Sequence, residues 1–191
     1  MASVIRFDNW QNTDGTSIAT TNASGDITFA GAVAGAGKIL QVVSITKTDT
    51  FSTTTISGAE ITGLSATITP TSTSSKILSV CNVDIGSSAD VFIVLSLLRG
   101  GSAISVADTA GSRRISTVGR YLGTATTAGV THASQTFSYL DSPSTLSSTT
   151  YSVEIGANSA ATLYVNRGHD DTDAASRFRA TSTITLMEVS A

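Results

Sequence analysis

Charged residues are scarce in this sequence, and their scarcity limits the partners that the protein can recognise. They make up 13% of the 191 residues, about half the share expected of a soluble domain. The 14 acidic residues outnumber the 11 basic ones, and the formal net charge is −3. Because a protein that neutralises DNA phosphates needs a surplus of Lys and Arg, we expect no nucleic-acid partner.

Long apolar runs and cysteines are lacking as well. The longest apolar run extends from Val91 to Leu98, is interrupted by Ser96, and is too short to cross a bilayer. The segment from Met1 to Trp10 has no apolar region of the kind found in signal peptides, so we expect no membrane partner. The single cysteine, Cys81, excludes an internal disulfide framework and favours folding in a cytoplasm.

The residues that are abundant favour β-structure. Ser and Thr together supply about 60 residues, and 40% of the chain is hydrophobic. This mixture is too apolar and too β-branched for ordinary disorder. Thr, Val and Ile fit pleated, half-buried surfaces, and Ser and Gly fit turns. The composition therefore predicts an all-β protein.

Alternating apolar and polar residues predict a series of strands from Lys38 onward. No window has apolar residues at helical spacing over three turns, and parallel sheets need crossover helices, so the sheets must be antiparallel. We predict an antiparallel β-sandwich or jelly roll with an extended N-terminal arm. The expected strands are 38–47, 60–69, 76–85, 91–99, 103–107, 115–122, 131–140, 150–155, 162–166 and 180–189.

Residues 1–37 differ from the domain at residues 38–191. They read as short extended pieces separated by Asn, Asp and Gly, and they end in a flexible Gly/Ala stretch. Because this segment has too few large side chains to build a core, we expect it to be an arm that docks onto partner chains. Trp10 is the only tryptophan, and large aromatics anchor interfaces. The candidate partner-binding residues are Phe7, Trp10, Ile18 and Phe29.

Catalytic patterns are missing from the sequence. Cys81 lies mid-strand without a suggested base, so we expect a small buried side chain rather than a nucleophile. His132 lies among Thr and Ala and is expected at a surface or interface. There is no Gly-x-Ser-x-Gly elbow and no complete phosphate-binding loop. We predict a non-enzymatic protein that needs no cofactor and no metal.

One acidic loop leaves two interpretations open. His169, Asp170, Asp171 and Asp173 follow one another closely, and carboxylate oxygens are the ligands that Ca²⁺ prefers. The spacing is not that of an EF-hand loop. The three nearby arginines at positions 167, 177 and 179 could equally pair with these acids, which would leave a loop without a cation.

Several segments resemble a domain found in surface proteins of tailed bacteriophages, both tail-fibre-like proteins and head-decoration proteins. The matching segments are 37–43, 47–52, 62–70, 74–78, 138–143, 149–151 and 183–189, and the arm is similar around Asp8, Trp10 and Ala23–Gly25. The resemblance implies a jelly-roll-like domain that assembles as a homotrimer on the virion surface. It implies no catalytic residue.

The short connection between the arm and the domain favours one of the two phage roles over the other. Tail fibres usually carry a long shaft, whereas here an arm joins almost directly to one domain. We therefore expect a capsid decoration (cement) protein that is made in the host cytoplasm. Its arm would dock onto the major capsid protein or other virion proteins. The alternative is a tail-fibre or spike tip that binds host surface glycan.

Overall fold

The structure is a computed structural model, and it describes residues 9–11, 17–21, 24, 27–29, 38–123 and 132–190. These residues form 14 β-strands and no helix. It follows that the described part of the chain contains no helix long and apolar enough to cross a membrane. The chain divides into two compact units, Met1–Lys38 and Ile39–Ala191.

The first unit contains three short strands. They are β1 (Asn9–Gln11), β2 (Ser17–Thr21) and β3 (Ile27–Phe29), and they form an antiparallel sheet in the order β1-β2-β3. The extended pieces that the sequence predicted here therefore pair with one another. Ala19 in the central strand is buried.

The second unit contains two sheets, and the first of them, named here the β8 sheet, has the order β10-β8-β12-β6 with β9 paired to β8. All its pairings are antiparallel. Its strands are β6 (Ala59–Ile68), β8 (Val91–Arg99), β9 (Ser102–Ile104), β10 (Val118–Leu122) and β12 (Thr149–Ala157).

The second sheet, named here the β7 sheet, has the order β4-β14-β7-β13-β5, and β11 pairs with the long strand β7. These pairings are antiparallel too. Its strands are β4 (Ile39–Lys47), β5 (Phe51–Thr53), β7 (Lys76–Ser87), β11 (His132–Asp141), β13 (Leu163–Val165) and β14 (Ser182–Val189).

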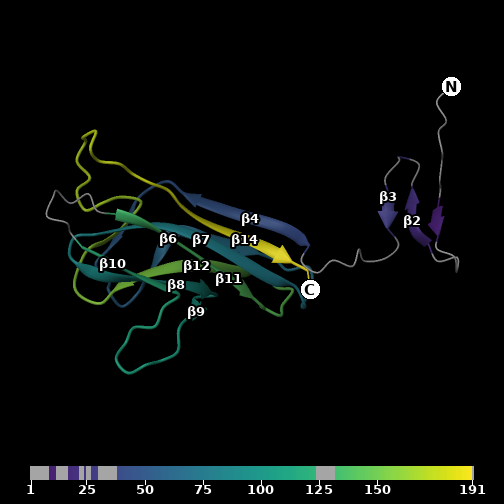
Figure 1. Ribbon diagram of the computed structural model, residues 1–191, viewed down its shortest axis with the longest axis horizontal. Helices are drawn as coiled ribbons and strands as arrows, with labels where there is room; N and C mark the ends of the chain where they lie inside the picture. Colours follow the sequence, from purple (N-terminus) through teal and green to yellow (C-terminus); the bar gives the residue numbers. More distant parts are fainter. Residues whose placement is uncertain are drawn as a thin grey trace. The chain divides into compact units, whose positions relative to one another are not determined.

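The hydrophobic core lies between the two sheets (Figure 1). Successive strand residues point to opposite faces, so in the long central strands every second residue enters the core. In β8 the inward residues are Val91, Ile93, Leu95 and Leu97, each at most 1% exposed. Burial of this apolar surface is the main force that holds the sheets together. The prediction of an all-β, antiparallel β-sandwich is confirmed.

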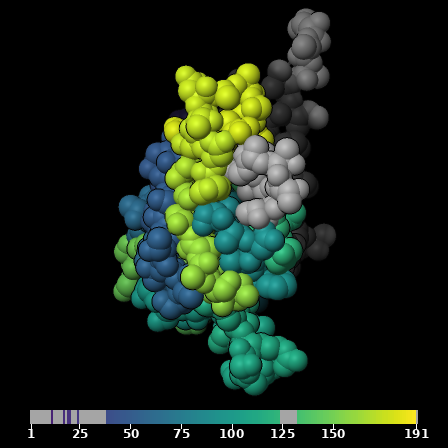
Figure 2. All heavy atoms as spheres, turned by 90° about the vertical axis from the view of Figure 1, so that its left-hand side faces the viewer, coloured from purple at the N-terminus to yellow at the C-terminus, as the bar shows by residue number. Residues whose placement is uncertain are grey.

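The ten expected strands all occur, with their ends shifted by a few residues. The strand that the pattern missed is β5, whose three residues Phe51–Thr53 are too few to show alternation. The expected strand at 115–122 is shorter than predicted, because residues 105–117 form a long connection between β9 and β10. This connection projects from the sandwich as the teal loop in Figures 1 and 2.

Candidate partner-binding surface

Strand β4 forms an edge of the β7 sheet and exposes an unusual number of apolar side chains. It pairs with β14, the next strand in the sheet order. Ile39 is 56% exposed, Leu40 47%, Val42 56% and Ile45 37%. No charged residue occurs before Lys47 at its end. Natural edge strands are usually guarded by charges, prolines or short length, because an open edge templates pairing with another chain.

An apolar row continues from β4 across the outer face of the sheet. Val42 lies opposite Met187, Met187 lies opposite Leu78, and Leu78 lies opposite Leu140. Residues that lie opposite each other in a ladder share a face and contact each other. Leu140 is 45% exposed, and Met187 and Leu78 are half-buried. We name these four residues the apolar row.

The next two rows along the strands are mostly polar and contain no charged residue. One comprises Ser44, Thr185, Val80 and Ser138, and the other Thr46, Thr183, Asn82 and Thr136. Ser44 and Thr185 share a hydrogen bond of 2.9 Å, and the Thr136 hydroxyl donates one of 3.0 Å to Asn82 Oδ1. This face therefore offers apolar and hydroxyl groups to a partner without like-charge repulsion.

A buried carboxylate holds β4 to its neighbours from the inner side. Glu188 in β14 is fully buried. Its carboxylate accepts hydrogen bonds of 2.7 Å from the Thr71 amide and hydroxyl and 2.6 Å from Gln41 Nε2 in β4. Burial alone would raise the pKa of Glu188, but the bonds from Gln41, Ser75 and Thr71 outweigh it and lower the pKa to about 2.

The candidate residues of the N-terminal arm lie in the first unit. Trp10 lies in β1, Ile18 in β2 and Phe29 in β3, whereas Phe7 lies outside the described residues. The register places Trp10 opposite Ala19 and Ala19 opposite Phe29. The topology thus brings Trp10 and Phe29 to one level across the small sheet, with Ile18 one position away. Their role in partner binding stays a prediction.

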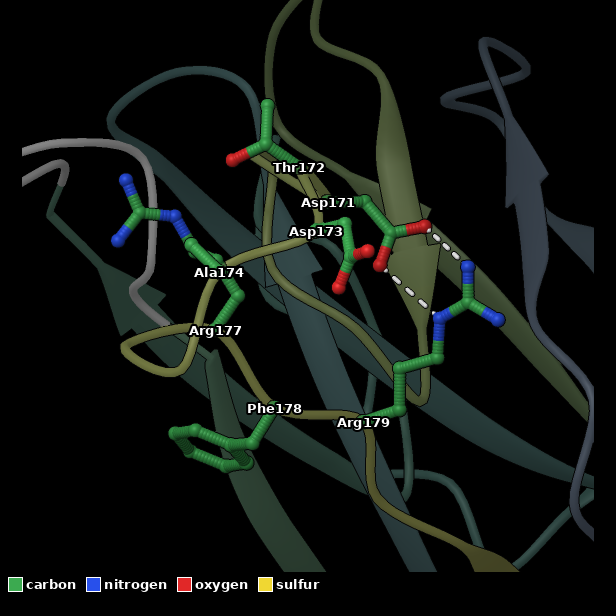
Figure 3. Close-up of a pocket in the computed structure, with 7 residues that line it drawn as sticks. All are labelled: Asp171, Thr172, Asp173, Ala174, Arg177, Phe178 and Arg179. Carbon is green, nitrogen blue, oxygen red and sulfur yellow. Dashed lines mark hydrogen bonds and ion pairs between the residues drawn. The ribbon is translucent and has the colours of Figure 1, made fainter.

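Two arginines bind carboxylates of the acidic loop. Arg177 donates to Asp170 at 2.9 and 2.6 Å. Arg179 donates to Asp171 at 3.0 and 2.6 Å (Figure 3). The Arg177 bonds lower the pKa of Asp170 to about 2, and the Arg179 bonds lower the pKa of Asp171. Residues 38–123 and 132–190 contain no group of three His, Cys, Asp or Glu side chains that could hold a metal ion. The arrangement matches the arginine alternative.

His169 in this loop points to a neighbouring aromatic residue. Its Nδ1 lies 3.0 Å from the Tyr164 hydroxyl. The guanidinium of Arg167 lies over the Tyr164 ring, 4.2 Å from its centre. These contacts fix the base of the loop, so His169 acts in packing here.

One buried pair has the composition of part of a hydrolytic triad. Nδ1 of His132 lies 2.5 Å from Oδ1 of Asp84, and their side chains are only 2% and 4% exposed. The expected surface position of His132 is wrong, because its ring packs with its centre 4.1 Å from that of Phe178. The other expected position, at an interface, stays a prediction. Its Nε2 is buried without a hydrogen-bond partner among the described residues. A catalytic histidine would take a nucleophile's proton at that atom.

Cys81 is inert. Its side chain is completely buried between the sheets, as the sequence predicted. Burial raises the pKa of the thiol to about 12, so the nucleophilic thiolate does not form near neutral pH.

Comparisons with known proteins add a distant likeness. No protein-family model matches this chain, and no curated protein sequence matches it. A chain in the solved structure of infectious bursal disease virus, Gx strain, is similar to it with a TM-score of 0.37 and 17% sequence identity. The similar region covers 78% of this chain and 39% of the viral chain, so the protein spans well under half the length of that neighbour.

Proposed function

We propose that the protein is a non-enzymatic structural component of a bacteriophage virion, and that it works as a homotrimeric capsid decoration protein. The observation that carries the proposal is the apolar edge formed by β4 and the apolar row. An open apolar edge and a contiguous exposed apolar patch are typical of a surface on which another chain packs. The sequence resemblance to surface proteins of tailed phages supplies the biological setting.

The trimer provides a cover for this surface. In a ring of three copies, each β4 and apolar row packs against a neighbouring copy. Because the face carries no charge in its three central rows, copies of the same chain meet there without repulsion. A trimer also presents three N-terminal units, so that weak contacts with the capsid add through effective concentration.

The polar clusters support a structural role rather than catalysis. The Asp170 and Asp171 carboxylates are bound to arginines, and the Cys81 thiol is buried. The Asp84–His132 pair holds strands β7 and β11 together, and Ser134 donates to the same carboxylate at 3.3 Å. These groups stabilise the sandwich and leave no activated nucleophile among them.

The docking role is proposed for the N-terminal unit. Three short strands with little apolar bulk offer a small surface, and Trp10 is the residue with the largest area to bury in a partner. Contacts with the major capsid protein would place the sandwich outside the shell, where it joins neighbouring capsomers against the pressure of the packaged genome.

The decisive experiment is to locate the protein on purified virions by cryo-electron microscopy. Density at three-fold positions of the capsid shell, with residues 1–37 against the shell, is the expected result. Density confined to the tail would overturn the decoration role and favour the alternative, a tail-fibre or spike tip that binds host surface glycan. A chain with residues 1–37 deleted should fold but no longer join particles; retained docking would contradict the role of the arm.

A further inference from the structure

The outer face of the β8 sheet contains a groove that the structural role leaves unexplained. Its volume is about 370 Å³, and it lies between the strands and the 105–117 connection. Val94, Ser96 and Glu154 line it from the sheet, and Arg113 and Ile115 line it from the connection. It lies on a different sheet from the apolar row.

Two glycines flank Val94, which lines the groove. Gly119 in β10 and Gly156 in β12 lie opposite Val94 on its two sides. At Gly156 a Cβ atom would lie 2.9 Å from both the Ile56 carbonyl oxygen and Arg114 Nη2, so this position requires glycine. Gly119 lies beside the lining residue Val94 rather than in the lining itself, and the nearest atoms to an added Cβ there lie at 3.6 and 3.7 Å, so a side chain has room at this position.

Arg114 fixes the wall of the groove. Its guanidinium donates to the carbonyl oxygens of Ile56 at 2.8 Å, Ala157 at 2.6 Å and Ser57 at 3.0 Å. These bonds tie the 105–117 connection to the ends of two other segments. The groove is therefore held open in the free protein, which reduces the cost of ordering it when a ligand binds.

The polar groups in the groove are suited to a neutral ligand rich in hydroxyls. The Glu154 carboxylate has no hydrogen bond or ion pair within the described part of the chain. Glu154 accepts hydrogen bonds, the Arg113 guanidinium donates them, and the Ser96 hydroxyl does both. Arg113 and Arg114 bring two positive charges to the lining and Glu154 one negative charge, and the Arg114 guanidinium is held by three carbonyl oxygens.

An exposed aromatic pair lies on the same face of the sheet, in the row of paired residues next to that of Val94. Phe92 and Tyr121 lie opposite each other, with ring centres 5.0 Å apart, and are 55% and 51% exposed. Phe92 is two residues from Val94 in β8, so the pair and the groove share a face about 7 Å apart along the strand. Aromatic rings give a large apolar contact area, and the tyrosine adds a polar edge.

From this juxtaposition we infer that the groove, extended by Phe92 and Tyr121, binds a neutral oligosaccharide of at least two sugar units. One unit lies on Val94 and exchanges hydrogen bonds with Glu154 and Arg113. The next packs its C–H face on the aromatic pair. A spacing of about 7 Å is longer than one sugar ring, so the site requires a chain of units. The inference does not depend on the trimer or on capsid docking.

The test is isothermal titration of the full-length protein with a panel of neutral trisaccharides built from glucose, galactose, mannose and N-acetylglucosamine. At least one should bind with a Kd in the micromolar to low millimolar range, about 10 mM at the weakest. The Phe92→Ala/Tyr121→Ala double variant and Glu154→Gln should each weaken binding by about tenfold. Gly119→Val, which adds a branched side chain next to Val94 on the same face, should abolish it.

Phe178→Ala is the matched control, because Phe178 is an aromatic residue, 64% exposed, outside the groove. Its binding should equal that of the unaltered protein, and each variant must retain its thermal transition and oligomeric mass. If Gly119→Val fails to fold, Glu154→Gln decides the result. The inference is overturned if no trisaccharide binds, if binding survives in the groove variants, or if neutral peptides bind there and sugars do not.

Discussion

The Tyr151 hydroxyl donates a hydrogen bond of 2.7 Å to Oδ2 of Asp141, and this bond joins the two sheets of the sandwich. Tyr151 is fully buried in β12, and Asp141 ends β11 of the other sheet. Arg99 in β8 binds both oxygens of the same carboxylate at 2.9 and 2.7 Å. Burial and the bond to Asp141 raise the pKa of Tyr151, so its hydroxyl stays protonated as a donor.

Removal of this hydroxyl should destabilise the sandwich. Tyr151→Phe keeps the ring but deprives a buried carboxylate of one donor, so the free energy of unfolding should fall by about 1–3 kcal/mol. Urea denaturation measures the change. Tyr139→Phe is the control, because the Tyr139 hydroxyl has no hydrogen bond in the described part of the chain. A loss as large in the control as in Tyr151→Phe would contradict the prediction.

Glu188 should make stability depend on pH in the acid range. Its pKa is about 2 in the folded protein and has an ordinary value of 4.5. Its contribution is complete above pH 4.5, decreases as the pH falls, and is lost below about 2, since the unfolded chain takes up the proton first. The melting temperature of Glu188→Gln should therefore lie below that of the unaltered protein at neutral pH and approach it near pH 2. A constant difference across this range would disprove the linkage.

A charge on the apolar edge should prevent assembly. Val42→Lys places an ammonium group in the apolar row, where a neighbouring copy would have to desolvate it. Light scattering coupled to gel filtration should show a trimer for the unaltered protein and a monomer for the variant. Leu146→Lys, at a loop position that is 58% exposed, should remain trimeric. If the Val42→Lys variant remains trimeric, the subunit contact lies on a different surface.

Close packing at Gly86 should make this position intolerant of alanine. A Cβ atom there would lie 2.5 Å from the Arg167 carbonyl oxygen and 3.3 Å from Gly168 Cα. Because both are backbone atoms, relief requires a shift of the strands, and Gly86→Ala should cost about 1–3 kcal/mol. Gly119→Ala, whose nearest contacts are 3.6 Å or longer, should change stability by less than about 0.5 kcal/mol. Equal effects of the two substitutions in chemical denaturation would refute this.

Calcium should not stabilise the protein. A cation that binds only the folded state raises its melting temperature, but Asp170 and Asp171 of the acidic loop are already bound by Arg177 and Arg179. Differential scanning calorimetry with about 5 mM CaCl₂ should give the same transition as with EDTA. A rise reversed by EDTA would show that a cation displaces the arginines.

Much of the fold could be predicted because alternation is a local property of a strand. The inward residues of β12 were visible as every second apolar residue, β8 was visible as a nearly continuous apolar run, and the absence of helical spacing required antiparallel sheets. The strand at 38–47 was expected from alternation around Ile39, Val43 and Ile45, which would place Ile39 with the buried residues. Ile39 is instead 56% exposed, because β4 lies at a sheet edge, where little covers its ends.

The candidate surfaces could not be predicted to the same extent. Val42, Leu78, Leu140 and Met187 are far apart in the chain, and only the ladder register brings them into one row. The same holds for Phe92 and Tyr121 beside the groove, and for His132, whose burial depends on Asp84 and Phe178. The sequence alone identified the aromatic residues of the N-terminal arm as candidates for partner binding. Large side chains in a segment with few others can be recognised without knowledge of the fold.

The sequence by itself determined the fold class, the approximate strands, the inert state of Cys81 and the two possible states of the acidic loop. Each of these follows from residue type and spacing over about ten residues. The tertiary structure decided strand order, the arginine pairing of the acidic loop, the open edge at β4 and the groove beside Val94. These depend on pairings between distant segments, whose free energy comes from burial and register rather than from any local preference.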